Sequence, residues 1–238
     1  MKILAIETST PASSVALGDD ESIVAMSLRV DRRGHVEFLI PAIDFCFAQA
    51  GWRPSDLDLV AVDVGPGPYT GIRAGISAAQ GIAAAVGVPV VTMSSLTVLA
   101  LRAATGRRQI WPVVDVRRGE VATAPFRPVP GGVMRDGPTE VVTPEMLCAL
   151  IDSRPSEALV VGDHQSLPES LFTGMHRTKT GRPRYPSADV MLEIAAIRSR
   201  QEDFPGPEDI RPLYLREPDA AINWAEFREE GMWPGAES

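Results

Sequence analysis

Short apolar runs separated by polar turns open the chain. Three of them, at residues 2–6, 13–17 and 23–30, predict strands joined by tight turns, which is typical of an antiparallel meander. From Val36 onward apolar side chains recur at helical spacing until Gly51. This spacing predicts an amphipathic helix that ends at the glycine.

The segments that follow alternate between strand and helix patterns. They are a strand over 57–64, a helix over 71–86, a strand over 88–92 and a helix from Ser94 to about residue 104. The predicted order of the first part of the chain is therefore βββαβαβα.

A similar order recurs in the rest of the chain. The expected elements are strands over 110–115, 120–126 and 133–137, a helix over 143–153 and a strand over 158–161. Two copies of βββαβα predict an α/β protein built from a duplicated unit. A charged turn at residues 105–108 separates the copies, so we predict two small domains, 1–105 and 106–238.

The pattern is weaker after residue 171. A helix is expected over 187–199, the Pro-rich stretch 204–213 is expected to be a loop, and residues 223–230 form a short polar helix at best.

The loop between the strand at 57–64 and the next helix is rich in Gly and Pro. Gly65 and Gly67 allow close backbone approach, Thr70 is a candidate helix cap, and Arg73 stands in the first helical turn. Exposed amides at a helix start favour anions, so one interpretation is a phosphate or nucleotide cradle. The alternative is a tight strand-to-helix turn that binds nothing. The spacing matches neither the Walker nor the dinucleotide pattern, and both interpretations stay open.

Composition limits the functions open to the chain. The 31 acidic and 23 basic residues give a net charge of −8, which opposes binding of a nucleic-acid backbone by this chain alone. Cys46 and Cys148 lie in apolar contexts and are expected to be reduced core residues. The three histidines are scattered singly and predict no metal site. No signal segment or spanning run is recognised, so we expect a cytoplasmic protein.

Four ordered motifs resemble one family. They are the run 3–10 with sequence ILAIETST, the loop 65–73 with sequence GPGPYTGIR, the segment 115–121 with sequence DVRRGEV, and the run 211–216 with sequence RPLYLR. The duplicated unit resembles the actin/sugar-kinase/Hsp70-like ATPase superfamily, and within it these motifs are similar to the TsaB family, also called YeaZ.

The resemblance implies a function. TsaB is the non-catalytic partner subunit of bacterial tRNA threonylcarbamoyladenosine synthesis, and it works with a catalytic TsaD subunit and the ATPase TsaE. We therefore expect no catalytic residue and no metal ligand in this chain. A residual nucleotide site would comprise six residues: Glu7, Thr8, Gly65, Gly67, Thr70 and Arg73. The chain departs from the family at Glu7, where Asp is usual, and at Pro68-Tyr69, where Ser-Phe is usual.

The first two long helices are the predicted partner surface. Small residues form one stripe of the second helix, and two Phe lie off the inward face of the first. The residues expected to contact a partner are Phe38, Phe45, Gly71, Gly75, Ala78 and Ile82. The alternative is that the small stripe packs inside its own domain.

Two functional hypotheses result. In the first, the chain is a scaffold subunit that pairs with a TsaD-like protein, forms a homodimer when alone, meets a TsaE-like ATPase and reaches tRNA only through the complex. It binds no cofactor tightly, and ATP enters only at the level of the complex. In the second, it is a stand-alone ATP-dependent small-molecule kinase that uses Glu7, Asp63 and the Gly/Pro loop.

Overall fold

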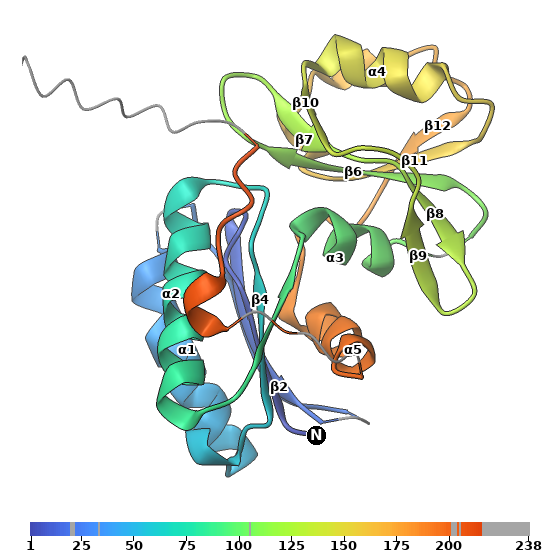
Figure 1. Ribbon diagram of the computed structural model, residues 1–238. Coiled ribbons are helices and arrows are strands. Elements are labelled where there is room, and N and C mark those ends of the chain that lie inside the picture. The colour runs from blue at the N-terminus through green and yellow to red at the C-terminus, as the bar shows by residue number, and fades with distance from the viewer. Residues whose placement is uncertain (20–21, 33, 105, 201–203, 205, 216–238) are drawn as a thin grey trace, which may run out of the picture.

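The computed structural model describes residues 1–19, 22–32, 34–104, 106–200, 204 and 206–215. Two mixed β-sheets lie one above the other, each with helices packed against it (Figure 1). The first sheet has the order β3-β2-β1-β4-β5. Its strands are β1 (Ile3–Glu7), β2 (Ala12–Gly18), β3 (Ile23–Val30), β4 (Leu59–Asp63) and β5 (Val90–Met93).

Helices cover both faces of the first sheet. On one face lie α1 (His35–Ala50), above β2 and β3, and α2 (Tyr69–Val86), above β4. On the other lies α5 (Ala188–Arg198), against β1 and β2. Every residue of β1 is buried, as expected for a central strand that is covered on both faces.

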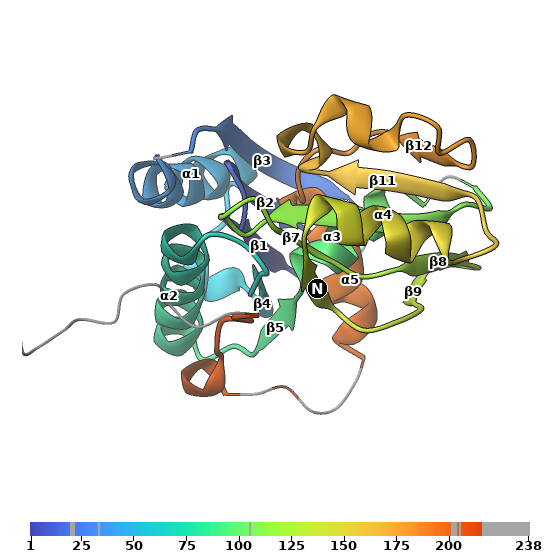
Figure 2. The same cartoon turned by 90° about the horizontal axis from the view of Figure 1, so that it is seen from above.

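The second sheet repeats this topology. Its main path is β10-β7-β6-β11-β12, with a hairpin of β8 and β9 at the side of β6. The strands are β6 (Gln109–Asp115), β7 (Val121–Thr123), β8 (Phe126–Val129), β9 (Gly132–Arg135), β10 (Glu140–Val142), β11 (Ala158–Gly162) and β12 (Thr178–Thr180). Here α4 (Pro144–Asp152) lies on the outer side of the sheet, in front of it in the view from above (Figure 2). Helix α3 (Ser95–Arg102) packs against β6 between the two sheets (Figure 1).

The predicted duplication is confirmed. In both sheets the first strand is central and two strands lie parallel to it on one side. On the other side an antiparallel neighbour and an outer strand follow, which are β2 and β3 in the first sheet and β7 and β10 in the second. The two units differ between their last two strands. The first unit has the long helix α2 there, whereas the second has only the short 3-10 turns His164–Ser166 and Glu169–Phe172.

Some predicted elements differ from the structure. The single strand expected over 120–126 is two strands, β7 and β8, because Pro125 lies at the break and cannot donate to a ladder. The helix α5 lies within the predicted second domain, 106–238, but it packs against the first sheet. The polar helix considered at 223–230 lies outside the described residues.

The C-terminal part of the described chain crosses the outside of α2. Residues 206–214, here called the strap, start near Gln80, whose side chain donates to the carbonyl of Pro207 at 2.6 Å. Ile210 is 3% exposed and joins the core beneath α1 and α2. The backbone N–H of Leu213 donates to the carbonyl of Val64 at 2.7 Å. The chain therefore returns to its first unit at the end. No helix in the described ranges is long and apolar enough to cross a membrane.

Candidate functional site

Two carboxylates meet at the ends of the central strands β1 and β4. Glu7 and Asp63 are both completely buried. The hydroxyl of Ser9 lies 2.7 Å from Oε1 of Glu7 and 3.1 Å from Oδ2 of Asp63, so it bridges the two side chains. The other oxygen of Glu7, Oε2, has no hydrogen-bond partner among the described residues. We call Glu7 and Asp63 the buried pair.

Burial changes the ionisation of the buried pair. Loss of solvent raises the pKa of Glu7 well above its usual value, and the neighbouring Asp63 raises it further. Burial also raises the pKa of Asp63 to about 8, against the opposing hydrogen bonds from Gly65, Ser9 and Ser95. Two carboxylates this close share a proton at neutral pH, because ionising both would place two negative charges together without water.

The Gly/Pro loop closes over the buried pair. A Cβ on Gly67 would lie 1.8 Å from the carbonyl oxygen of Ser9, and a Cβ on Gly65 would lie 2.8 Å from the side chain of Ile72. The loop also accepts two bonds from Ser95, through the carbonyls of Gly65 and Pro66. These glycines therefore permit close packing within the chain, which is the second of the two interpretations given for the loop.

The remaining residues of the predicted nucleotide site point to other partners. Thr8 is buried and donates to the carbonyl of Gly71 at 2.7 Å. The predicted cap role of Thr70 is wrong, because α2 begins at Tyr69 and Thr70 lies inside its first turn. The N-cap residue is Pro68, and no side chain caps the helix. Arg73 lies against the rings of Tyr69 and Tyr214, and its Nε donates to the Tyr214 hydroxyl at 2.6 Å.

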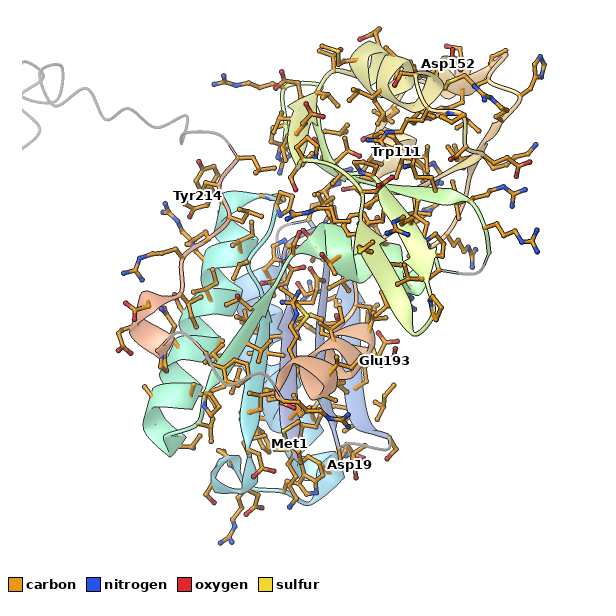
Figure 3. All side chains as sticks on the ribbon, turned by 45° about the vertical axis from the view of Figure 1, so that its right-hand side comes forward. Met1, Asp19, Trp111, Asp152, Glu193 and Tyr214 are labelled. Atoms are coloured by element: carbon orange, nitrogen blue, oxygen red, sulfur yellow. The ribbon has the colours of Figure 1, made fainter. Side chains whose placement is uncertain are left out.

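Tyr214 belongs to the strap and lies beside the N-terminal end of α2 (Figure 3). The contact joins residues 141 positions apart, so local sequence patterns do not reveal it.

The carboxylate of Glu7 is sealed beneath the Gly/Pro loop and has no solvent-exposed oxygen. Across the described ranges, no three His, Cys, Asp or Glu side chains are placed to hold a metal ion.

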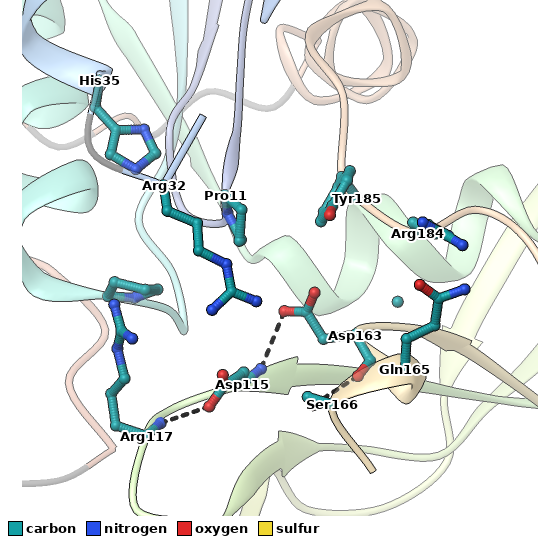
Figure 4. A pocket seen from close by; sticks show the side chains of 12 residues that line it. Pro11, Arg32, His35, Asp115, Arg117, Asp163, Gln165, Ser166, Arg184 and Tyr185 are labelled. Atoms are coloured by element: carbon teal, nitrogen blue, oxygen red, sulfur yellow. Dashed lines mark hydrogen bonds between the residues drawn. The ribbon is translucent and has the colours of Figure 1, made fainter. Parts of the chain in front are cut away.

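A cavity of about 210 Å³ opens between the two sheets, next to the buried pair (Figure 4). Its lining comes from both units: Pro11, Arg32, His35, Pro68, Asp115, Arg117, Gly162, Asp163, Gln165, Ser166, Arg184 and Tyr185. Asp115 ends β6, and Asp163 directly follows β11. The backbone N–H of Asp115 donates to Oδ2 of Asp163 at 3.2 Å. We call Asp115 and Asp163 the cleft pair.

Asp163 and His35 are perturbed by the cavity walls. Burial raises the pKa of Asp163 to about 6, and the charge of Asp115 adds to this while Arg32 opposes it. Burial lowers the pKa of His35, whose Nδ1 lies 2.6 Å from the Ser13 hydroxyl. Sequence reasoning did not select Arg32, Asp163 or Arg184, because they come from three separate loops and only the fold brings them together.

The outer surface of the first unit is formed by α1 and α2. Three large apolar side chains of α1 are exposed: Val36 by 64%, Ile40 by 55% and Phe45 by 50%. The exposed positions of α2 are Thr70, Arg73, Ser77, Gly81, Ala84 and Ala85. Arg73 is the one charged residue in the 18 residues of α2. We call this surface the outer helix face.

The residues predicted to bind a partner fall into two groups. Phe45 lies on the outer helix face, and Phe38, Ala78 and Ile82 are partly buried at the edge of the core below it. Gly71 and Gly75 are buried inside the unit, where a Cβ would meet the carbonyl of Thr8 at 2.1 Å and its hydroxyl at 2.4 Å. Their small size is thus explained by packing of α2 onto β1, the alternative stated for this stripe.

Fold and comparisons define the class and the family. The duplicated sheets with a central cleft have the α/β fold of the actin/sugar-kinase/Hsp70-like ATPase superfamily. The solved structure of YeaZ from Pseudomonas aeruginosa matches with a TM-score of 0.77 and 26% identity, covering 90% of this chain and 100% of that one. A family model described as "TsaD: tRNA N6-adenosine threonylcarbamoyltransferase" matches residues 29–142.

Curated relatives carry the name "tRNA threonylcarbamoyladenosine biosynthesis protein TsaB". The Escherichia coli (strain K12) protein is 30% identical over 91% of this chain and 95% of its own length. The Haemophilus influenzae protein is 32% identical over 91% of this chain and 94% of its own length. The chain belongs to the TsaB family.

Proposed function

We propose that this protein serves tRNA threonylcarbamoyladenosine synthesis as a non-catalytic subunit, which holds a TsaD-like catalytic subunit through its outer helix face. The names of its curated relatives support the pathway. The surface chemistry of α1 and α2 supports the mode of action, and the closed Gly/Pro loop favours a scaffold over the alternative of a stand-alone kinase.

The observation that supports the scaffold role most directly is the composition of α2. A helix face that stays in water normally carries charged residues, which α2 lacks apart from Arg73 near its N-terminal end. Its exposed Ser77, Gly81, Ala84 and Ala85 allow the backbone of another helix to approach closely. Exposed Phe45 on α1 adds an aromatic side chain of a type that is enriched in the cores of protein interfaces.

The same face serves a second copy of the chain when no partner is present. A helix pair that exposes apolar side chains can be self-complementary about a two-fold axis, so a homodimer and a heterodimer compete for it. In the complex, tRNA is bound mainly by the partner, because the net charge of −8 repels phosphate.

The test is a charge placed on the outer helix face. In Ala85→Glu the new carboxylate projects from an exposed position of α2, so the monomer keeps its fold, but association must bury an unpaired charge. We expect a folded monomer by circular dichroism and size-exclusion chromatography. Its affinity for the TsaD-like subunit should fall by about a hundredfold or more.

The matched control is Met146→Glu on α4, the helix that the second unit carries in place of α1. Met146 is 55% exposed, so the chemistry of the change is similar but the surface differs. Met146→Glu should bind the TsaD-like subunit as the unchanged protein does. Undiminished binding by folded Ala85→Glu, or an equal loss in Met146→Glu, would refute the proposal.

A further inference from the structure

Strand β3 is an open edge of the first sheet, since the strand order begins with it and no strand in the described part of the chain lies beyond it. Figure 2 shows β3 beside α1, on the side of the first unit away from α2. Large apolar side chains are exposed along it: Ile23, Val24, Leu28 and Val30. Proteins normally protect such an edge with charges, prolines or bulges. Arg29 is the one charged residue of β3, the strand contains no proline, and its one irregularity lies at its start.

The ladder between β2 and β3 shows which backbone groups of β3 face outward. The N–H of Asp31 donates to the carbonyl of Pro11 at 2.9 Å, which continues the register of the two strands. Bonded residues alternate in an antiparallel pair, so every second residue before Asp31 bonds to β2. The residues between them direct their N–H and C=O groups toward the open edge; they are Met26, Leu28 and Val30. No turn or loop bond in the described ranges reaches these groups.

The side chains of the same three residues share one face of the sheet. Met26 packs against the core cluster that α5 forms with the first sheet, and side chains alternate along a strand, so Leu28 and Val30 lie on this face too. Because α5 lies against β1 and β2, these two side chains stay 50% and 55% exposed. Free backbone groups and apolar side chains therefore coincide on one edge, which is what the addition of another strand requires.

The strand is complementary to itself in the antiparallel direction. With a two-fold axis at Leu28, this residue lies opposite Leu28 of a second copy, and Met26 lies opposite Val30 of the second copy. Each of these pairs exchanges two backbone hydrogen bonds. Arg29 lies opposite Ser27 of the second copy, so no like charges meet within the strands. We propose that β3 binds β3 of a second copy of this chain, so that the two five-stranded sheets become one continuous sheet.

The helices above the sheet fit the same arrangement. Helix α1 packs over β2 and β3, and neighbouring strands lie about 4.8 Å apart. On a joined sheet the α1 helices of the two copies are then separated by two strand spacings, or about 10 Å, which is a normal packing distance for helices. The second copy therefore continues the helical layer as well as the sheet.

This contact is separate from the one proposed for α2. Helix α2 packs over β4, which lies on the far side of β1 and β2 from β3, so a copy bound at β3 leaves α2 free for the TsaD-like subunit. Three residue pairs form a smaller contact than the roughly 1,600 Å² of a stable complex. We therefore expect a weak dimer with a dissociation constant on the order of 0.1 mM, which does not persist at the micromolar concentrations of chromatography.

The first experiment tests the register with cysteines. In Leu28→Cys the new thiols of two copies lie in one bonded pair with Cα atoms about 5.5 Å apart, a distance that a disulfide spans. Oxidised glutathione should convert this variant to a covalent dimer, in a Cys148→Ser background where the other cysteine, Cys46, is buried. The matched control is Val30→Cys, which is similarly exposed but lies opposite Met26 of the second copy. Its thiols are held apart, so it should stay monomeric.

The second experiment removes one outward donor. In Leu28→Pro the lost N–H faces the open edge, where proline is tolerated, so the ladder to β2 stays intact. Sedimentation equilibrium is measured in an Ala85→Glu background, in which the contact proposed for the outer helix face is blocked. Leu28→Pro should raise the dissociation constant of the dimer by about tenfold or more. The control Leu28→Val keeps the N–H and an apolar side chain, and should change this constant by less than about threefold.

Each variant is first checked for an unchanged circular dichroism spectrum, and if Leu28→Pro does not fold, the cysteine pair decides. Three results would overturn the proposal. They are a monomer at millimolar concentration in the Ala85→Glu background, equal cross-linking of Leu28→Cys and Val30→Cys, and equal association of folded Leu28→Pro and Leu28→Val. None of these measurements uses the TsaD-like subunit, so their outcome is independent of the test of the proposed function.

Discussion

The two halves of the molecule place a pair of carboxylates at equivalent positions and use them differently. Glu7 and Asp115 each end the central strand of their sheet, and Asp63 and Asp163 stand at the ends of the next parallel strands. The local bonding is also repeated, because the N–H two residues later returns to the first carboxylate in both halves, from Ser9 at 2.7 Å and from Arg117 at 2.8 Å.

The two halves differ in the residue that stands two positions after the first carboxylate and in the loop that lies above the carboxylate pair. In the first half Ser9 bridges the pair and the Gly/Pro loop seals it. In the second half the equivalent residue is Arg117, which faces an open cavity. One duplicated frame thus provides a closed end and an open end whose walls carry both arginines and carboxylates. The following experiments test that contrast, from the largest expected effect to the smallest.

Opening the closed end is the most disruptive change. In Gly67→Ala the new Cβ would lie 1.8 Å from the Ser9 carbonyl, so the loop must move off the buried pair. We expect a loss of about 3 kcal/mol in the free energy of unfolding, measured by urea denaturation. The control is Gly81→Ala on α2, where a new Cβ would meet open space. This variant should instead raise the free energy of unfolding by about 0.5–1 kcal/mol. An unchanged free energy of unfolding in Gly67→Ala would show that the loop does not pack closely against Ser9.

The two pairs should also differ in how pH affects stability. In the buried pair the folded pKa values are raised, so its favourable contribution is complete below about pH 4, the usual carboxyl range, and is lost as pH rises through about 8. Unfolding free energies across pH 4–9 should decline accordingly, by on the order of a few kcal/mol.

Substitution separates the contributions of the two pairs. Glu7→Gln should reduce the decline and stabilise the protein most at the alkaline end. Asp163→Asn should remove only the part between about pH 4 and about 6, because the folded pKa of Asp163 is about 6. An identical profile for both variants would contradict the difference between the closed and open ends.

The bridging hydroxyl of Ser9 has a smaller expected effect. Ser9→Ala removes the bonds of 2.7 and 3.1 Å to the two buried carboxylates, and we expect a loss of about 1–3 kcal/mol by thermal denaturation. The control Ser166→Ala, at the open end, removes an exposed bond to the carbonyl of Asp163 and should change stability by less than about 0.5 kcal/mol. Equal losses would mean that burial does not distinguish the two ends.

The strap is hydrogen-bonded to the first half, through Gln80, Val64 and Arg73, and gives the smallest expected effect. Tyr214→Phe removes the 2.6 Å bond from Arg73 but keeps the ring beside Tyr69, with centroids 4.3 Å apart. We expect a loss below about 1 kcal/mol. Tyr214→Ala, which also removes the ring contact, should lose more, and hydrogen exchange at the start of α2 should rise with it. An unchanged exchange rate in Tyr214→Ala would argue against a stabilising role for the strap.

Element order was readable from the sequence because it depends on local periodicity. The helix expected from Val36 to Gly51 is α1, and the patterns at 187–199 and 143–153 are α5 and α4, within about a residue at each end. The strands β10 and β12 were missed, since three residues each give too short a pattern.

The sites were less predictable, because they depend on contacts between distant segments. The Gly/Pro loop suggested an anion cradle, yet the feature that closes it, the Ser9 backbone, lies more than fifty positions away. Arg73 was expected to face a ligand and instead contacts Tyr214, and the cavity joins loops from three parts of the chain. Whether Arg73 meets a ligand or Tyr214 is determined by the tertiary fold and not by the local sequence.

The return of the chain to its first sheet has a consequence for biosynthesis. While only residues 1–105 have left the ribosome, the face of β1 and β2 that α5 will cover has no occupant, and neither has the core position of Ile210. The N–H of Ala188 completes the bonding of Ser14 across 174 positions. The nascent first half therefore exposes apolar strands until residues 188–210 have been made, so native closure of the first sheet comes late in synthesis and the exposed face is open to aggregation until then.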